Sequence, residues 1–257
     1  MTDQVRVLSH ELRLFGVHGG YEKRVAEAEG QGLTHLEFLR LILEDEVLQR
    51  KNRSAQALLT KAKFRSQVSL EEWDTSYDRG ITKQKLRELG SLSFYNNLEN
   101  LLIIGKTGQG KTHLAVSLGR RLCQENISAV FIPMNFLFEE VLAARASGKY
   151  LNYVKKLTQT KALIFDDFGL RNYTHEEATV LVDVLEERHR KGSVIVTSQV
   201  DPKGWSKLFE DPVIAEAITD RLLNPSQKIK MEGEKYRGKL QSTLKKKKKL
   251  AESKMLN

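Results

Sequence analysis

From about residue 98 onward, the spacing of hydrophobic positions alternates between two patterns, and this alternation predicts the fold class. Short apolar runs that read as strands occur at Leu101–Ile104, Ala129–Ile132, Ala162–Phe165, Val194–Val196 and near Lys228–Met231. Longer amphipathic stretches that read as helices lie between them, up to Cys123, from Asn135 and over Glu176–Arg190. Strands that alternate with helices favour a parallel sheet in an α/β domain.

The first 68 residues carry helical spacing instead. Thr34 and Glu37 fit a capping box, and the apolar residues behind it recur at helical intervals, at Leu36, Leu39, Leu43, Val47 and Leu48. They predict a long helix to about Phe64. Val5, Leu8, Leu12 and Phe15 predict a shorter helix that ends near Gly19-Gly20. We therefore expect a small helical domain over 1–68, a connector over 69–97 that is helical around 83–92, the α/β domain over 98–240 and a basic tail over 241–257.

Composition narrows the class of protein. Of the 257 residues, 40% are hydrophobic and 29% charged, which is ordinary for a globular chain. The apolar runs are far shorter than the roughly 18–20 residues of a membrane helix, so no membrane partner is expected. The start shows no secretory signal, and Cys123 is the single cysteine, so we expect a cytoplasmic protein without disulfides. The six histidines show no zinc-binding spacing, and no structural metal is predicted.

The charge, +9 overall, is concentrated in three basic blocks. The first contains Arg50, Lys51, Arg53, Lys61, Lys63 and Arg65, and the second contains Arg145, Lys149, Lys155, Lys156 and Lys161. The third is the lysine run of the tail, which is interpreted first as a solvated chain end and second as a contact with nucleic acid. The internal blocks are either polar faces of surface helices or surfaces that neutralise the phosphates of a nucleic acid.

A glycine-rich stretch, Gly105–Thr112, fits the pattern G-x-x-x-x-G-K-[ST] directly after a strand and before a helix. Its glycines allow backbone amides to approach phosphates, Lys111 would reach the terminal phosphates, and Thr112 would hold Mg²⁺ through its hydroxyl. The sequence therefore predicts ATP with Mg²⁺ as the bound species. The expected binding residues are Gly105, Lys106, Thr107, Gly108, Gln109, Gly110, Lys111, Thr112 and His113.

Two carboxylates end the predicted strand over 162–165. We expect Asp166 to organise Mg²⁺ and Asp167 to orient and deprotonate the attacking water, because phosphoryl transfer depends on positioning and electrostatics. The alternative is two surface aspartates that cap a helix.

These motifs resemble the AAA+ ATPases, specifically the branch of the IstB-type transposition helpers and the DnaC-type replicative helicase loaders. The resemblance is strong over about 95–240 and weaker over the N-terminal helix, which is closer to the transposition helpers. It is carried by the stretches Gly110–Ala115, Ile164–Gly169, Val196–Gln199, Asp220–Leu222 and Gly233–Arg237.

The resemblance implies further site residues. A polar residue after the fourth strand would sense the γ-phosphate, and this is Ser198 or Gln199, since the asparagine common in many relatives is absent. Arg221 falls where the family carries an arginine finger that acts on a neighbouring subunit's nucleotide. Its alternative is a surface arginine paired with Asp220 or Glu216. Arg237 is a candidate second sensor, although this branch lacks the usual lid domain.

The family also implies rings or spirals of subunits around DNA, with an insertion between the second and third strands that contacts it. Here that insertion is the second basic block, so Lys149, Lys155 and Lys156, with Arg145, are the first candidates for DNA contact. Second choices in the N-terminal helix are Arg50, Lys51 and Arg53. The aromatic residues Phe131, Phe136 and Phe138 are interpreted as core rather than as a base-stacking surface.

We therefore expect a DNA-binding AAA+ ATPase that hydrolyses ATP, oligomerises on duplex target DNA without sequence preference, and recruits or activates a transposase of an insertion sequence. A helicase loader would use the same ATPase for another client. An architectural DNA-binding protein would use its nucleotide only as a structural switch.

Overall fold

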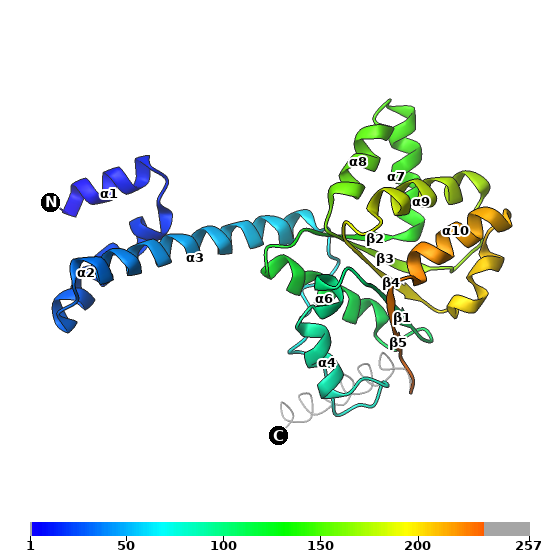
Figure 1. Ribbon diagram of the computed structural model, residues 1–257, viewed down its shortest axis with the longest axis horizontal. Coiled ribbons are helices and arrows are strands. Elements are labelled where there is room, and N and C mark those ends of the chain that lie inside the picture. Colours follow the sequence, from blue (N-terminus) through cyan, green and yellow to red (C-terminus); the bar gives the residue numbers. More distant parts are fainter. Residues whose placement is uncertain (1, 234–257) are drawn as a thin grey trace, which may run out of the picture.

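The computed structural model describes residues 2–233, which form an α/β domain and a helical arm that projects from it (Figure 1). The arm consists of α1 (Thr2–Glu11), α2 (Phe15–Gln31) and α3 (His35–Lys61). In Figure 1, α3 runs outward from the α/β domain, and α1 and α2 lie at its far end. None of the helices within residues 2–233 has the length and hydrophobicity needed to cross a membrane.

The expected single helix that ends near Gly19-Gly20 is wrong. This stretch forms two helices, because α1 ends at Glu11 and α2 begins at Phe15 and continues through both glycines to Gln31. Contact with α3 offsets the low helix propensity of glycine. At Gly16 the two helices come so close that a Cβ atom would lie 2.5 Å from the Asp45 carbonyl oxygen. Arg24 of α2 also forms an ion pair with Asp45, with Nε and Oδ2 2.8 Å apart.

Helix α3 begins at the predicted cap, where Thr34 accepts a hydrogen bond from the Glu37 amide and the Glu37 carboxylate accepts one from the Thr34 amide. The apolar side of α3, which the amphipathic pattern would place in the core, is not the side that is buried. The side that packs on α2 includes Ile42 and Glu46. The apolar residues that predicted the helix face solvent; we call Leu36, Leu39, Leu43 and Val47, which are 51–78% exposed, the α3 stripe.

The α/β domain contains the predicted sheet of parallel strands, in the order β2-β3-β4-β1-β5. The strands are β1 (Asn100–Ile104), β2 (Ala129–Pro133), β3 (Ala162–Phe168), β4 (Ser193–Ser198) and β5 (Ser226–Lys230). The remaining helices are α4 (Lys83–Gly90), α5 (Ser93–Asn96), α6 (Lys111–Gln124), α7 (Met134–Ala146), α8 (Tyr150–Gln159), α9 (His175–Arg188) and α10 (Pro212–Leu223), with a 3₁₀ helix at Pro202–Leu208. The fold class predicted from the alternating pattern is confirmed.

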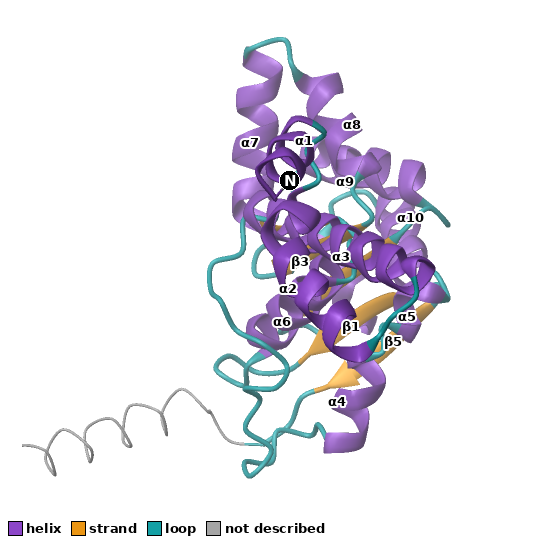
Figure 2. Ribbon diagram, turned by 90° about the vertical axis from the view of Figure 1, so that its left-hand side faces the viewer, coloured by secondary structure: helices purple, strands orange, loops and turns teal. Residues whose placement is uncertain are grey.

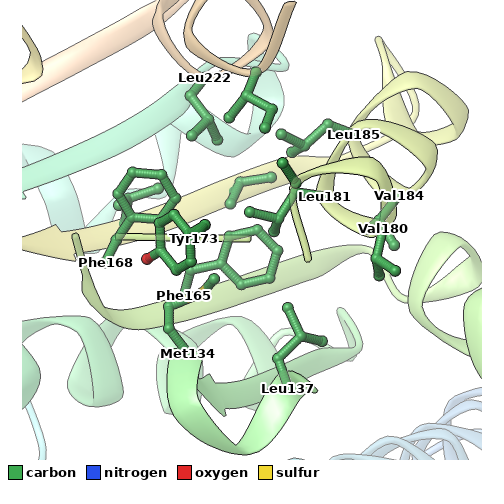
Figure 3. Close-up of a cluster of buried hydrophobic side chains, with 14 of the residues drawn as sticks. Met134, Leu137, Phe165, Phe168, Tyr173, Val180, Leu181, Val184, Leu185 and Leu222 are labelled. Atoms are coloured by element: carbon green, nitrogen blue, oxygen red, sulfur yellow. The ribbon is translucent and has the colours of Figure 1, made fainter. Parts of the chain in front are cut away.

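Alternate residues of the central strands β1, β3 and β4 face opposite layers of helices. Leu101 and Ile103 pack with α4, α5 and α6 on one face of the sheet, whereas Leu102 and Ile104 belong to the layer of α7, α9 and α10. Figure 3 shows the second layer, where aromatic rings from β3 lie between α7 and the helices α9 and α10. Both faces of the central strands β1, β3 and β4 are buried, which explains why they read as continuous apolar runs, whereas the edge strand β5 buries only Ile229.

One buried cation joins three elements at the amino end of the sheet. The Arg188 side chain is 3% exposed. Its guanidinium donates to the carbonyls of Leu157 (2.8 Å), Lys161 (3.1 Å) and Ser193 (3.2 Å). Burial lowers the pKa of Arg188 to about 10. These bonds tie the end of α8 to the starts of β3 and β4.

Candidate nucleotide-binding site

The predicted phosphate-binding loop connects β1 to α6. Gly108 and Gly110 adopt φ angles of 81° and 99°, in the left-handed region that glycine enters without steric cost. At Gly105 a Cβ atom would lie 2.8 Å from the Met231 carbonyl oxygen, so the loop passes close to the chain after β5. The loop delivers its backbone to the amino end of α6, where unpaired amides and the helix dipole favour an anion.

Lys111 lies at the first turn of α6 and is 5% exposed. Its Nζ donates to the carbonyl of Lys106 at 3.1 Å. Burial lowers the pKa of Lys111, and the negative charges of Asp167 and Asp166 oppose that shift. The predicted lysine and both predicted carboxylates are therefore close enough to interact electrostatically.

Asp166 accepts hydrogen bonds from two threonine hydroxyls. Thr112 Oγ1 donates to its Oδ1 at 2.9 Å, and Thr197 Oγ1 donates to the same oxygen at 2.6 Å. Burial raises the pKa of Asp166 although both bonds favour its ionised form. Thr197 comes from β4 and was missed by sequence reasoning. Thr197 belongs to the stretch Val196–Gln199 that carries the family resemblance, but the sequence does not show that this strand lies beside the one that ends in Asp166.

Asp167 has a different environment from its neighbour. A register shift in β3 lies between Phe165 and Phe168, and Asp167 adopts φ 59° within it. The residue is exposed, and its amide donates to Thr197 Oγ1 at 3.0 Å. A non-glycine residue in the left-handed region at such a position is typical of functional sites. The bulge gives one buried and one solvent-accessible carboxylate at the same strand end.

The oxygens of Thr112 and Asp166 fit a magnesium ion. Mg²⁺ prefers hard oxygen ligands, and it is commonly held by one or two protein groups together with phosphate oxygens of a substrate. Residues 2–233 contain no cluster of three or more His, Cys, Asp or Glu that would bind a metal unaided. This donor set therefore suits an ion that is completed by nucleotide phosphates.

The two candidate sensors lie at the end of β4 but differ in surroundings. Ser198 is fully buried, and its hydroxyl donates to the Phe168 carbonyl at 2.7 Å and accepts from the Val200 amide at 3.1 Å. Gln199 is exposed just beyond the strand. Because it is exposed, Gln199 is better placed than Ser198 to contact a ligand.

Arg221 lies in the last turn of α10 and pairs with Glu186 of α9 and, at 3.5 Å, with Asp220. Its backbone carbonyl accepts a hydrogen bond from Asn100, the first residue of β1, at 2.8 Å. The phosphate-binding loop leaves the other end of β1, and four residue steps at about 3.3 Å each separate the two ends. Arg221 therefore lies away from the loop of its own chain.

The predicted DNA-contact residues divide into two groups. Lys149, Lys155 and Lys156 are exposed at or on α8, and the Arg145 guanidinium lies 4.8 Å from the centre of the Tyr150 ring. The N-terminal candidates belong to the arm: Arg50 pairs with Glu46 at 2.6 Å, Arg53 lies over the Phe15 ring, and Lys51 borders the α3 stripe. Arg237 and the lysine tail lie outside the described residues.

The connector contributes residues that sequence reasoning did not assign to the site. The Arg79 guanidinium stacks on the buried Trp73 ring at 3.6 Å, and a Cβ atom on Gly110 would lie 3.0 Å from its Nη1. The His113 ring meets the edge of Trp73 at 5.4 Å and so faces the connector. Gln109 donates to the Gly233 carbonyl at 3.0 Å. The phosphate-binding loop is thus supported from the connector and from the chain after β5.

The sequence family follows from a comparison with known proteins. The family model described as IstB-like ATP binding protein matches residues 7–244. The chain belongs to this family. The IstB-like chain is 31% identical to an ATP-binding protein of insertion sequence IS21 from Pseudomonas aeruginosa, over 91% of this chain and 88% of the relative. It is 28% identical to the ATP-binding protein of insertion sequence IS5376 from Geobacillus stearothermophilus, over 92% of this chain and 94% of the relative.

Solved structures agree on the fold. DnaI matches with a TM-score of 0.55 at 18% identity, over 65% of this IstB-like chain and 92% of DnaI. The DnaC helicase loader matches with a TM-score of 0.54 at 18% identity, over 66% of this chain and 100% of the loader structure. The resemblance to the IstB branch stated from motifs is confirmed, and the chain is an IstB-like ATP-binding protein.

Proposed function

We propose that this IstB-like protein hydrolyses ATP with Mg²⁺, assembles on target DNA and recruits or activates the transposase of an insertion sequence. The observation that carries the proposal is the convergence of Lys111 and Thr112 with Asp166 and Asp167 in a chain whose relatives belong to insertion sequences.

The residues at the loop support hydrolysis as well as binding. Thr112 and Asp166 would hold Mg²⁺, which, when bound, neutralises charge on the phosphates. Lys111 stabilises negative charge on the terminal phosphate, and the exposed carboxylate of Asp167 orients the attacking water and accepts its proton. Gln199 is the favoured group to contact the γ-phosphate, because the Ser198 hydroxyl is already bonded to backbone.

Assembly is supported by the position of Arg221. The side chain lies at the end of the sheet opposite to the loop of its own chain, so it would complete a neighbour's site in trans. Its present partners, Glu186 and Asp220, lie at the surface. The α3 stripe supplies a second reason to expect association, because a contiguous exposed apolar surface marks a protein interface.

DNA is supported as the partner by the exposed lysines of α8. Lys149, Lys155 and Lys156 stand on one helical insertion with α7, and such groups bind phosphates without reading base sequence. Figure 2 shows α7 and α8 side by side, joined at the tip by a short loop. We expect duplex DNA to stimulate ATP turnover. The helicase-loader alternative has the same ATPase and predicts a preference for single strands.

The test is the rate of ATP turnover together with particle mass by light scattering, each with and without duplex or single-stranded DNA. Lys111→Ala should weaken ATP binding, Asp167→Asn should bind ATP but turn it over slowly, and Arg221→Ala should bind ATP as a single subunit but lose turnover. Arg87→Ala, on the surface helix α4, is the matched control for Arg221→Ala.

Duplex-stimulated turnover with large ATP-dependent assemblies supports the proposal. Normal turnover by Arg221→Ala would contradict the trans role. Stimulation by single strands alone would favour the helicase loader, and tight DNA binding without any turnover would favour the architectural protein.

A further inference from the structure

The two internal basic blocks, which are distant in the sequence, meet at one pocket on the β2 edge of the sheet. The first block reaches it with Lys61, Lys63 and Arg65, where the chain leaves α3, and the second with Lys156 of α8. The Phe131 amide of β2 donates to the Ala62 carbonyl at 2.9 Å, which fixes this segment against the edge strand. We call the site the edge pocket.

The pocket contains an aromatic ring that is not buried in the hydrophobic core. Of the three phenylalanines interpreted from the sequence as core, Phe131 and Phe138 are 2% and 4% exposed, as expected. For Phe136 that interpretation is wrong, because its side chain is 44% exposed. It lies in the first turns of α7, which begins directly after β2, so it stays at the mouth of the pocket. The Arg65 guanidinium lies 5.5 Å from the centre of its ring.

The charge balance of the pocket favours an anion. Its single acid, Glu140, accepts hydrogen bonds from Lys63 Nζ at 2.6 Å and from the Tyr153 hydroxyl at 2.9 Å. Lys61, Arg65 and Lys156 form no salt bridge within the part of the chain that the structure describes. Three exposed cations without a salt bridge therefore line the pocket, and one of them, Arg65, lies over the Phe136 ring. The fourth cation, Lys63, is paired with Glu140.

The pocket also lies near the nucleotide site. Pro133, at the end of β2, is the register partner of Asp166 on β3. The charge of Arg65 acts on Asp166, where it opposes the rise in the pKa of that carboxyl. A ligand at Arg65 is thus placed to influence the carboxylate that would hold Mg²⁺.

We propose that the edge pocket binds an unpaired nucleotide of the bound DNA, with the base stacked on Phe136 and the flanking phosphates held by Lys61, Arg65 and Lys156. The combination of a cationic surface with an exposed aromatic ring is the chemistry that recognises unstacked bases. The proposal rests on the proposed DNA-binding function and deepens it, because it adds contact with a base to contact with the backbone.

The test compares two DNA probes by fluorescence anisotropy, with the full chain and a non-hydrolysable ATP analogue. One probe is a duplex with a single bulged adenosine, and the other carries an abasic residue in the same bulge. Because of base stacking on the aromatic side chain, the wild-type protein should bind the adenosine probe roughly 5-fold to 140-fold more tightly than the abasic probe. Phe136→Leu should abolish this difference, and Phe136→Trp should retain it.

Matched variants separate stacking from general effects. Leu151→Ala removes another exposed apolar side chain, on α8 and outside the pocket, and should retain the difference between the probes. Lys156→Gln should weaken the binding of both probes equally. It should also reduce the slope of log affinity against log salt concentration by about one unit. Arg121→Gln, on α6, should not change that slope.

Two results would overturn the proposal while leaving the proposed function intact: equal binding of both probes by the wild type, or an undiminished difference in Phe136→Leu. If the wild-type protein binds neither probe nor an unbroken duplex, the proposed function fails and the edge pocket proposal with it. Unchanged binding of the abasic probe by Phe136→Leu shows that this variant is folded, so that its loss of the difference reports on stacking.

Discussion

Replacing Thr197 with valine removes two hydrogen bonds at the end of β3 while keeping the shape of a fully buried side chain. The Thr197 hydroxyl donates to Asp166 Oδ1 at 2.6 Å and accepts from the Asp167 amide at 3.0 Å. The first bond holds the carboxylate predicted to organise Mg²⁺, and the second holds the left-handed residue beside it. Thr197→Val should therefore reduce both stability and ATP turnover.

The size of the loss depends on pH. A hydrogen bond to an ionised group is worth about 1.5–3 kcal/mol, whereas a neutral one is worth about 0.5–1.5 kcal/mol. Burial raises the pKa of Asp166 above its unfolded value, so ionisation of this carboxyl opposes folding, and the cost grows as pH rises through the folded pKa. Without Thr197 the ionised form loses its shortest hydrogen bond. The destabilisation caused by Thr197→Val should consequently be larger at neutral pH than in acid.

Thermal unfolding of Thr197→Val and wild type at pH 5 and pH 7.5 tests this reasoning. A loss of about 2 kcal/mol corresponds to a midpoint lower by roughly 4–8 °C in a chain of this size. Thr197→Ser keeps the hydroxyl and should stay near the wild type in both turnover and pH dependence. An equal midpoint shift at both pH values, or a valine variant with full turnover, would refute the assignment.

Three other substitutions have defined outcomes. Arg188→Met leaves buried carbonyls unpaired and should lower the unfolding free energy by about 3 kcal/mol or more, with exposed Lys191→Met as the control in the same denaturant titration. Trp73→Ala removes the ring that supports Arg79 at the phosphate-binding loop, so ATP titrations should show weaker binding, and unaltered affinity would contradict this role. Glu186→Gln frees Arg221 from a partly exposed ion pair and should raise turnover at limiting protein concentration by up to about 5-fold; an unchanged rate means that the pair does not compete with assembly.

The local features of this protein were predictable because each depends on neighbouring residues. The strand and helix periods predicted the α/β class, and the glycines at 105–110 predicted a phosphate-binding loop. In the structure this loop lies between β1 and α6. The capping box at Thr34 located the start of α3. In each case the physical cause lies within a few residues of the chain.

The periodicity of α3 predicted a helix but could not predict its orientation. The stripe of leucines reads as a buried face, yet the structure buries Ile42 and Glu46 against α2 and leaves the stripe in solvent. Likewise, glycines that read as a helix end lie inside α2, because packing against α3 offsets their propensity. Which side of a helix is buried depends on its partner, and no local pattern contains that partner.

The sequence by itself determined the strands, the phosphate-binding loop and the two carboxylates. Only the tertiary structure placed Thr197 on Asp166, Trp73 and Arg79 on the loop, and Arg65 beside Lys156 at the edge pocket. These pairs come from segments that are distant in the chain and meet because of strand order and the path of the connector. The burial of a side chain and its hydrogen-bond partners depend on these long-range contacts. They decide which polar residues can act on a nucleotide or on DNA.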